Sequence, residues 1–253
     1  MKWKIWNKLW SCMLSCLMAF ATAFSVGACV LGNGGDSSSA SDTPAGFTEL
    51  TYIAFGDSIT WGEVGATQEQ MEKPYPVLVA EDMGFKAVKN YGQRNASVKY
   101  MQSKPNVITQ VSEAVKKADI VSVMIGINDF GAGCQLGTMQ DTSCTESVYG
   151  GFNQLASSLK SKYPDAFIFI MTPLKPFDWA ETNKAGYTLV DMSNAIKEVC
   201  AANDFAVLDL NATSEFSSQT DPYCPDGLHP SQYYFTNYMV PKITQFIRAN
   251  YNK

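Results

Sequence analysis

Short apolar runs alternate along most of the chain with stretches whose apolar residues recur at helical spacing. The runs predict buried strands at residues 50–55, 87–91, 120–125, 167–171 and 205–210. Helical spacing predicts core-facing helices across Val107, Ile108, Val111, Ala114 and Val115, across Leu189, Met192, Ile196, Val199 and Cys200, and across Tyr238, Met239, Ile243, Phe246 and Ile247. The order βαβαβαβαβα therefore predicts an α/β fold, a three-layer α/β/α sandwich with a five-stranded parallel sheet.

The N-terminal segment departs from this alternation and has the pattern of an export signal. Three lysines precede an apolar stretch from about Met13 to Val26, and the small pair Gly27-Ala28 comes just before Cys29. Residues 26–29 resemble a bacterial lipobox, which implies a lipoprotein-type signal peptide over residues 1–28 and lipidation of Cys29. An ordinary signal peptide or an uncleaved anchor helix remains the alternative.

Residues 29–47 are rich in Gly and Ser, and this composition predicts a flexible tether that buries no core. The folded domain is then expected over residues 48–253, held on a membrane by the lipid of Cys29. The expected location is outside the cytoplasm, at the bacterial cell surface or on the periplasmic face of a membrane.

Composition and charge narrow the class of protein. The chain has 253 residues, of which 46% are hydrophobic and 17% charged, as expected of one ordinary soluble domain with short appendages, for which we expect a monomer. Its net charge is -5, and loss of the three lysines of the leader would bring it to about -8. This balance argues against nucleic acid as a partner.

Four cysteines follow Cys29, namely Cys134, Cys144, Cys200 and Cys224. An even number in an exported protein is compatible with disulfides, and Cys134 with Cys144 is the preferred pair among three connectivities. With no Cys-x-x-Cys pair and one histidine, a zinc site is disfavoured, so neither a metal nor a cofactor is expected. A cysteine nucleophile is also disfavoured, because none adjoins His229 in sequence, although proximity in the fold stays open.

Candidate chemistry begins where the first predicted strand ends, at Gly56-Asp57-Ser58. The carboxyl ends of parallel strands face the ligand crevice, so a serine just beyond one is displayed there. A serine hydroxyl is a weak nucleophile that needs an oriented base. The alternative is a structural turn without chemistry.

The single histidine of the chain, His229, is the one available imidazole base. Asp226 lies three residues before it, where its carboxylate can fold back onto the second ring nitrogen. Gly227 and Pro230 bracket the histidine in a tight loop, a setting that fixes the ring. These residues predict a Ser58, His229 and Asp226 triad.

Two further strand ends offer hydrogen-bond donors for an oxyanion. The strand at 120–125 leads into Gly126-Ile127-Asn128-Asp129, which places the Asn128 amide at the same sheet edge as Ser58. The strand at 87–91 leads into Gly92, whose backbone N–H can approach a ligand closely. Asp57 and Asp129 are expected to hold their loops through backbone hydrogen bonds.

In this order, the Gly-Asp-Ser, Gly, Gly-x-Asn-Asp and Asp-x-x-His-Pro motifs resemble the four blocks of the SGNH (GDSL-type) hydrolase superfamily, from about residue 50 to the C-terminus. The resemblance implies a flavodoxin-like strand order and Ser58 as nucleophile. It implies an oxyanion hole of Ser58 N–H, Gly92 N–H and the Asn128 side chain, with His229 as base and then acid, oriented by Asp226. Asn95 stands where the second block often has a further glycine. Asparagine tolerates left-handed backbone conformations better than most residues, so this loop is still expected to form.

The resulting hypothesis is an esterase that works through an acyl-enzyme on Ser58. A surface-tethered bacterial member of this family resembles an esterase that removes acetyl or other short acyl groups from carbohydrate more than it resembles a lipase, because no extended apolar lid is visible. Its partner is a small-molecule or polysaccharide acyl ester, and Trp61, Phe130 and Trp179, with Phe177 and Tyr223, are candidates to line its site or simply to pack loops onto the sheet. The alternatives are a lysophospholipase or thioesterase, an acyltransferase, and a non-catalytic carbohydrate-binding lipoprotein. A histidine base predicts that kcat/KM falls below about pH 6 to 7.

Overall fold

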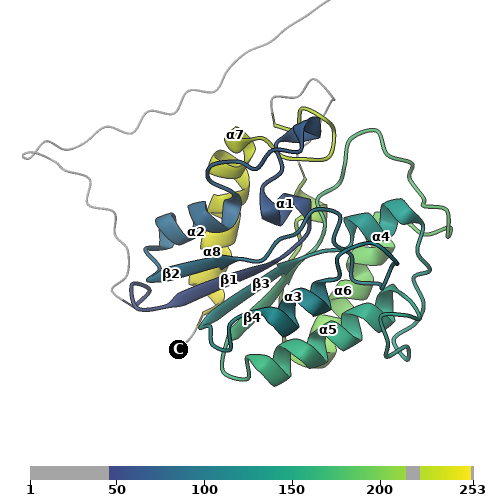
Figure 1. Ribbon diagram of the computed structural model, residues 1–253, viewed down its shortest axis with the longest axis horizontal. Helices are drawn as coiled ribbons and strands as arrows, with labels where there is room; N and C mark the ends of the chain where they lie inside the picture. The colour runs from purple at the N-terminus through teal and green to yellow at the C-terminus, as the bar shows by residue number, and fades with distance from the viewer. Residues whose placement is uncertain (1–45, 215–222, 252–253) are drawn as a thin grey trace, which may run out of the picture. The chain divides into compact units, whose positions relative to one another are not determined.

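A five-stranded parallel sheet forms the centre of the computed structural model, which describes residues 46–214 and 223–251 (Figure 1). Its spatial order is β2-β1-β3-β4-β5. The strands are β1 (Thr51–Gly56), β2 (Ala87–Asn90), β3 (Ile120–Met124), β4 (Phe167–Met171) and β5 (Ala206–Leu208). The leader, Cys29 and nearly all of the predicted tether lie outside the described residues.

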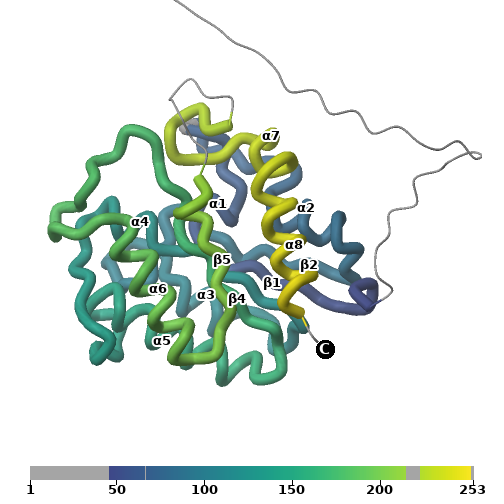
Figure 2. Tube along the Cα trace, turned by 180° about the vertical axis from the view of Figure 1, so that it is seen from behind, coloured from purple at the N-terminus to yellow at the C-terminus, as the bar shows by residue number. Residues whose placement is uncertain are grey.

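Alternate side chains of the strands divide the core into two clusters, one on each face of the sheet. Ile53 and Phe55 of β1 point into the cluster covered by α3 (Val107–Glu113), α5 (Val148–Lys162) and α6 (Leu189–Asn203). Tyr52 and Ala54 point into the opposite cluster, covered by α2 (Tyr75–Met83) and α8 (Val240–Asn250). Figures 1 and 2 show these two helical layers from opposite sides.

Local sequence fixes where the longer helices begin. Ser147 caps α5 by accepting a hydrogen bond from the N–H of Gly150. Thr188 and Asp191 form a reciprocal capping box at the start of α6. The apolar faces of these helices then supply most of the buried surface against the sheet.

Short elements occupy the loops, several of them at the carboxyl ends of the strands. They are α1 (Ser58–Trp61), α4 (Ile127–Ala132), α7 (Gln232–Tyr234), the 3-10 turns η1 (Gly65–Thr67) and η2 (Asn211–Thr213), and the π-helical turn η3 (Phe235–Met239). Within the described part of the chain, no helix is long and apolar enough to cross a membrane.

The predicted three-layer architecture and the flavodoxin-like strand order are confirmed. The last strand is shorter than the predicted 205–210, because Leu210 already turns into η2 and pairing with β4 ends at Leu208. The helix that contains Cys200 continues to Asn203 before Asp204, in the left-handed conformation, ends it.

The predicted disulfide between Cys134 and Cys144 is wrong, because both thiols are free. Cys134 lies two residues after the end of α4, where its N–H donates to the carbonyl of Asp129, and its sulfur lies 3.7 Å from that of Met101. Cys144 is held elsewhere, since its N–H donates to Gln154 Oε1 at the flank of α5. Cys200 and Cys224 are both fully buried.

Candidate active site

Ser58 is presented by an abrupt change from strand β1 to helix α1. Gly56 permits it, because a Cβ at this position would lie 2.3 Å from the carbonyl oxygen of Met124 on the neighbouring strand. Asp57 then caps α1, accepting a hydrogen bond from the N–H of Ile59 at 3.0 Å. As the first residue of the helix, Ser58 has a backbone N–H with no partner inside the helix.

His229 and Asp226 reach Ser58 from the other end of the chain. His229 Nε2 lies 2.9 Å from Ser58 Oγ, and Nδ1 lies 2.7 Å from Asp226 Oδ2. The hydroxyl, the imidazole and the carboxylate thus form one hydrogen-bonded chain across 171 residues of sequence. Ser58 is 6% exposed and His229 is 9% exposed, so the hydrogen bond between them is shielded from bulk water.

The carboxylate of Asp226 is held in its charged form. Burial alone would raise its pKa, but hydrogen bonds from the His229 ring and from the N–H groups of His229 and Leu228 outweigh burial and lower the pKa to about 2. Oδ1 accepts both backbone bonds, which leaves Oδ2 for the ring. The carboxylate is therefore both ionised and oriented at neutral pH.

The loop that carries His229 is fastened to its surroundings by backbone hydrogen bonds. The N–H of Gly227 donates to the carbonyl of Cys224, and that of Ser231 donates to the carbonyl of Tyr223. Phe177, from the loop after β4, donates its N–H to the carbonyl of Gly227. The sequence candidates Phe177 and Tyr223 thus brace the histidine loop through their backbones.

Asn128 lies at the start of α4, at the carboxyl end of β3. Its Nδ2 donates to the carbonyl of Ala96 at 2.9 Å, which fixes the amide while one of its two N–H bonds remains for another acceptor. The next residue, Asp129, is fully buried and accepts hydrogen bonds from the N–H groups of Val98 and Lys99. The predicted loop-holding role of Asp129 is confirmed, as is that of Asp57.

Gly92 is placed as expected, but its N–H is not free in the structure. A Cβ at this position would lie 2.3 Å from Trp61 N, so the glycine lets the loop pack against the backbone of α1. The N–H donates to Asn90 Oδ1 at 2.9 Å, and Asn90 Nδ2 donates to the carbonyl of Thr60. Asn95, further along this loop, has φ +60°, a left-handed conformation that asparagine tolerates.

Sequence reasoning missed Glu63, a buried carboxylate beside the histidine. Its Oε2 lies 3.5 Å from His229 Nε2, and its Oε1 accepts a hydrogen bond from Arg94 Nη2 at 3.0 Å. The Arg94 guanidinium lies 5.7 Å from the ring centroid of Trp61, the first of the aromatic candidates. The position of Glu63 five residues after the serine is a signal that only the folded turn after α1 makes meaningful.

The other two aromatic candidates form a stack over α4. The rings of Phe130 and Trp179 are 6.3 Å apart and inclined by 14°, and Gly131 leaves room for the indole. Phe130 is buried, whereas Trp179 is 39% exposed. A hollow of about 340 Å³ lies beside this stack, and its polar lining consists of Lys175, Glu181, Thr188 and Asn211.

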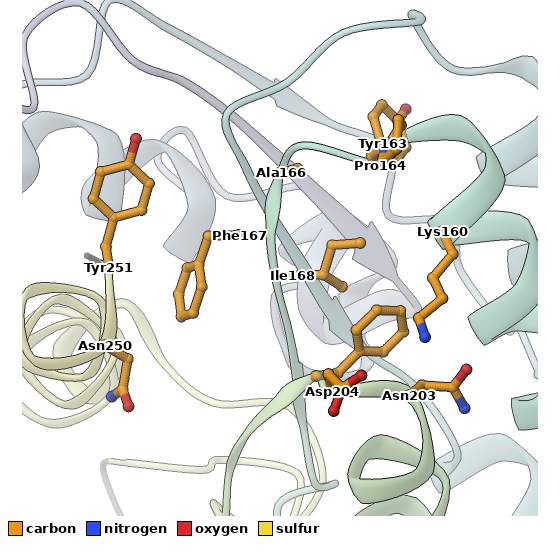
Figure 3. A pocket seen from close by; sticks show the side chains of 11 residues that line it. Lys160, Tyr163, Pro164, Ala166, Phe167, Ile168, Asn203, Asp204, Asn250 and Tyr251 are labelled. Atoms are coloured by element: carbon orange, nitrogen blue, oxygen red, sulfur yellow. The ribbon is translucent and has the colours of Figure 1, made fainter. Parts of the chain in front are cut away.

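A second hollow, of about 390 Å³, lies at the opposite end of the strands, where β4 begins (Figure 3). It is lined by the start of β4 at Phe167 and Ile168 and by the ends of α5, α6 and α8. None of the predicted site residues lines it. Among the described residues no cluster of three or more His, Cys, Asp or Glu side chains could hold a metal ion.

Comparison with known proteins places this geometry in context. The model of the GDSL-like Lipase/Acylhydrolase family matches residues 54–233. No match was found among curated proteins. Similar solved structures include a possible lipase from Chitinophaga pinensis, with 22% sequence identity, a TM-score of 0.63 and coverage of 79% of this chain and 98% of that chain.

Two further structures are similar at 17% identity and a TM-score of 0.60. One is the aryl esterase of M. smegmatis, with coverage of 79% of this chain and 99% of that chain. The other is a carbohydrate acetylesterase family member from Sinorhizobium meliloti, with coverage of 79% and 98%. At such identities the likeness concerns the fold.

Proposed function

Since the chain belongs to the GDSL-like lipase/acylhydrolase family and is a carboxylic ester hydrolase, we propose that it cleaves esters through an acyl-enzyme on Ser58. The observation that carries this proposal is the hydrogen-bonded chain from Ser58 Oγ through His229 to Asp226, with links of 2.9 and 2.7 Å. A serine, an imidazole base and an orienting carboxylate in this arrangement are the parts that nucleophilic acyl transfer requires.

In the first half of the reaction, Asp226 holds the ring proton on Nδ1, so that Nε2 can accept the proton of Ser58. As Oγ bonds to the acyl carbon, the carbonyl becomes an oxyanion. Collapse of this intermediate breaks the bond to the alcohol oxygen, which takes the proton from Nε2 as it leaves. Water then gives a proton to Nε2, attacks the acyl-enzyme and releases the acid, and the proton returns to Ser58.

The oxyanion is proposed to lie between the N–H of Ser58 and the free N–H of the Asn128 amide. Gly92 N–H becomes the third donor when it exchanges Asn90 Oδ1 for the oxyanion. This change of acceptor lowers the energy, because hydrogen bonds to a charged acceptor are stronger than those to a neutral amide oxygen.

For the substrate, we propose acetyl or other short acyl esters of carbohydrate. The exposed face of Trp179 offers an apolar surface for a sugar ring, and the hollow beside it has lysine, glutamate, threonine and asparagine side chains for hydroxyl groups. One neighbour in fold is itself described as a carbohydrate acetylesterase family member. Export and lipid anchoring through Cys29 remain part of the proposal on the sequence of the leader alone.

The test measures acetate release from acetylated plant and bacterial glycans, alongside hydrolysis of p-nitrophenyl acetate and of a long-chain p-nitrophenyl ester. We expect acetate release and preference for the short ester, both lost in Ser58→Ala. Trp179→Ala should raise KM for the glycan several-fold and leave p-nitrophenyl acetate hydrolysis unchanged. Faster turnover of the long-chain ester would overturn the carbohydrate assignment, and activity retained by Ser58→Ala would overturn the nucleophile.

A further inference from the structure

Glu63 is a carboxylate that the proposed mechanism does not yet use. Its side chain is 8% exposed, and its backbone N–H donates to the carbonyl of Ser58 at 2.9 Å. This bond closes the turn after α1 and directs the carboxylate back toward the active site. Oε2 comes to 3.5 Å from His229 Nε2, the nitrogen that also faces Ser58 Oγ.

The separation of 3.5 Å determines what Glu63 can do. It is longer than the 2.9 Å between Nε2 and Ser58 Oγ and is outside the ordinary range for a hydrogen bond to nitrogen. Glu63 therefore does not compete with Ser58 for the proton in this geometry. A charge at this distance in a shielded site nevertheless acts strongly on a neighbouring charge.

Arg94 controls how much of that charge His229 experiences. Its Nη2 donates to Glu63 Oε1, the oxygen that faces away from the histidine. Arg94 belongs to the loop of Gly92, so the ion pair also joins the serine turn to the loop of the proposed oxyanion hole. The positive guanidinium partly offsets the field of the Glu63 carboxylate at the imidazole ring.

The other groups that face the imidazole are already accounted for. Asp226 contacts Nδ1, on the opposite side of the ring, and Ser58 contacts Nε2. Asp57, which is fully buried at the N-cap of α1, interacts with His229 through its charge without touching it. Glu63 is thus the carboxylate on the side of the ring where the transferred proton arrives.

We propose that Glu63 is a positioning residue that stabilises the protonated His229 ring from its Nε2 side, with Arg94 setting the strength of this effect. The inference rests on the proposed acyl-enzyme mechanism. When Ser58 gives its proton to Nε2, the ring becomes an imidazolium held between the carboxylates of Asp226 and Glu63. Glu63 therefore favours the charge-separated state that accompanies attack, and it also favours proton uptake by the resting enzyme at low pH.

Two substitutions that remove charges of opposite sign should move the acidic limb of the pH profile of kcat/KM in opposite directions. Glu63→Gln keeps the size of the side chain but removes its negative charge. The pH at which kcat/KM is half-maximal should therefore fall by about one unit. The plateau should fall about tenfold, because the base is weaker. Arg94→Gln leaves Glu63 unopposed, so half-maximal kcat/KM should move to higher pH.

A second, exposed arginine and carboxylate pair provides the matched control. Arg248 Nη2 lies 3.1 Å from Asp82 Oδ2, on α8 and α2. Asp82→Asn and Arg248→Gln change the same charges far from the histidine, and both should keep the wild-type pH profile. Far-UV circular dichroism and thermal melts establish that each variant is folded.

The pH dependence of labelling by a fluorophosphonate gives a readout of serine activation that does not depend on the substrate. It should shift in the same directions as kcat/KM in the two variants. If folded Glu63→Gln or Arg94→Gln loses rate while the acidic limb of the profile does not move, the pair has only a structural role. That result would overturn the proposal. If Glu63→Gln does not fold, the shift of Arg94→Gln decides alone. Failure of the acyl-enzyme itself would be seen separately, as Ser58→Ala that still turns over ester.

Discussion

Single side chains at this site have two kinds of partner, one structural and one reserved for chemistry. Asn128 illustrates this division, because one N–H of its amide is used by the Ala96 carbonyl and the other is available to an oxyanion. Replacement by alanine removes both. The two effects can be separated, since one belongs to the folded state and the other to the transition state.

For Asn128→Ala we expect kcat/KM for p-nitrophenyl acetate to fall a hundredfold or more, by loss of an oxyanion donor. The unsatisfied carbonyl of Ala96 should cost about 1 kcal/mol of stability, seen as a small decrease in Tm. Asn237→Ala is the control, because Asn237, in the turn η3, is exposed and its Nδ2 donates to the nearby backbone carbonyl of Tyr233 in α7. An Asn128→Ala enzyme with full activity would remove this residue from the oxyanion hole.

At this scale the sequence was informative wherever a residue type is rare and its chemistry demanding. A single imidazole with a carboxylate three residues before it predicted the pair His229 and Asp226. In the structure His229 Nε2 lies 2.9 Å from Ser58 Oγ, and Nδ1 lies 2.7 Å from Asp226 Oδ2. The contact of Glu63 with the His229 ring was not predicted, because glutamate is a common residue and its approach to the ring depends on the turn after α1. The hydrogen bond from Gly92 N–H to Asn90 Oδ1 was not predicted either. The side chain of Asn90, two residues away, competes locally for this donor.

Between elements, the decisive feature is the close packing of β1 against β3 at the point where α1 begins. Gly56→Ala would place a methyl group 2.3 Å from the Met124 carbonyl oxygen and 2.2 Å from Thr60 Oγ1. Since the first is backbone, the strands must move apart. We expect a loss of about 2 to 3 kcal/mol in the free energy of unfolding, measured by urea denaturation.

Gly46→Ala is the matched control, because a Cβ there would meet no atom within 4 Å. Its free energy of unfolding should match that of the wild type within about 0.5 kcal/mol. Equal stability of Gly56→Ala and Gly46→Ala would contradict the proposed contact between β1 and β3.

Elements with a strong pattern were predictable, and elements set by tertiary contacts were less so. The buried strands read as continuous apolar runs because both of their faces are covered. The short helix α4 could not be predicted from periodicity, because Ile127–Ala132 spans less than two turns and begins at Gly126 in a conformation with φ +123°. Its position was nevertheless implied by the Asn-Asp motif that it carries.

Over the whole molecule, two fully buried carboxylates connect stability with pH. Burial raises the pKa of Asp57 and of Asp129 to about 7, against the hydrogen bonds that lower it. An unfolded aspartate titrates near pH 3.9, so between about pH 4 and 7 the folded chain binds more protons than the unfolded chain. Stability contributed by these protons is complete below about pH 4 and is lost as the pH rises through 7.

The free energy of unfolding should therefore decrease between pH 5 and 7, with a slope of up to about 1.4 kcal/mol per pH unit from each carboxylate. Asp226 does not interfere, since its pKa is lowered to about 2 and its contribution disappears only under stronger acid. Asp57→Asn can keep the bond to Ile59 N–H through its carbonyl oxygen and should reduce the slope by about half. Urea denaturation at several pH values measures both slopes. A wild-type stability that rises from pH 5 to 7, or an unchanged slope in Asp57→Asn, would contradict the account, because the protonated N-cap is what links the start of α1 to the stability of the whole fold.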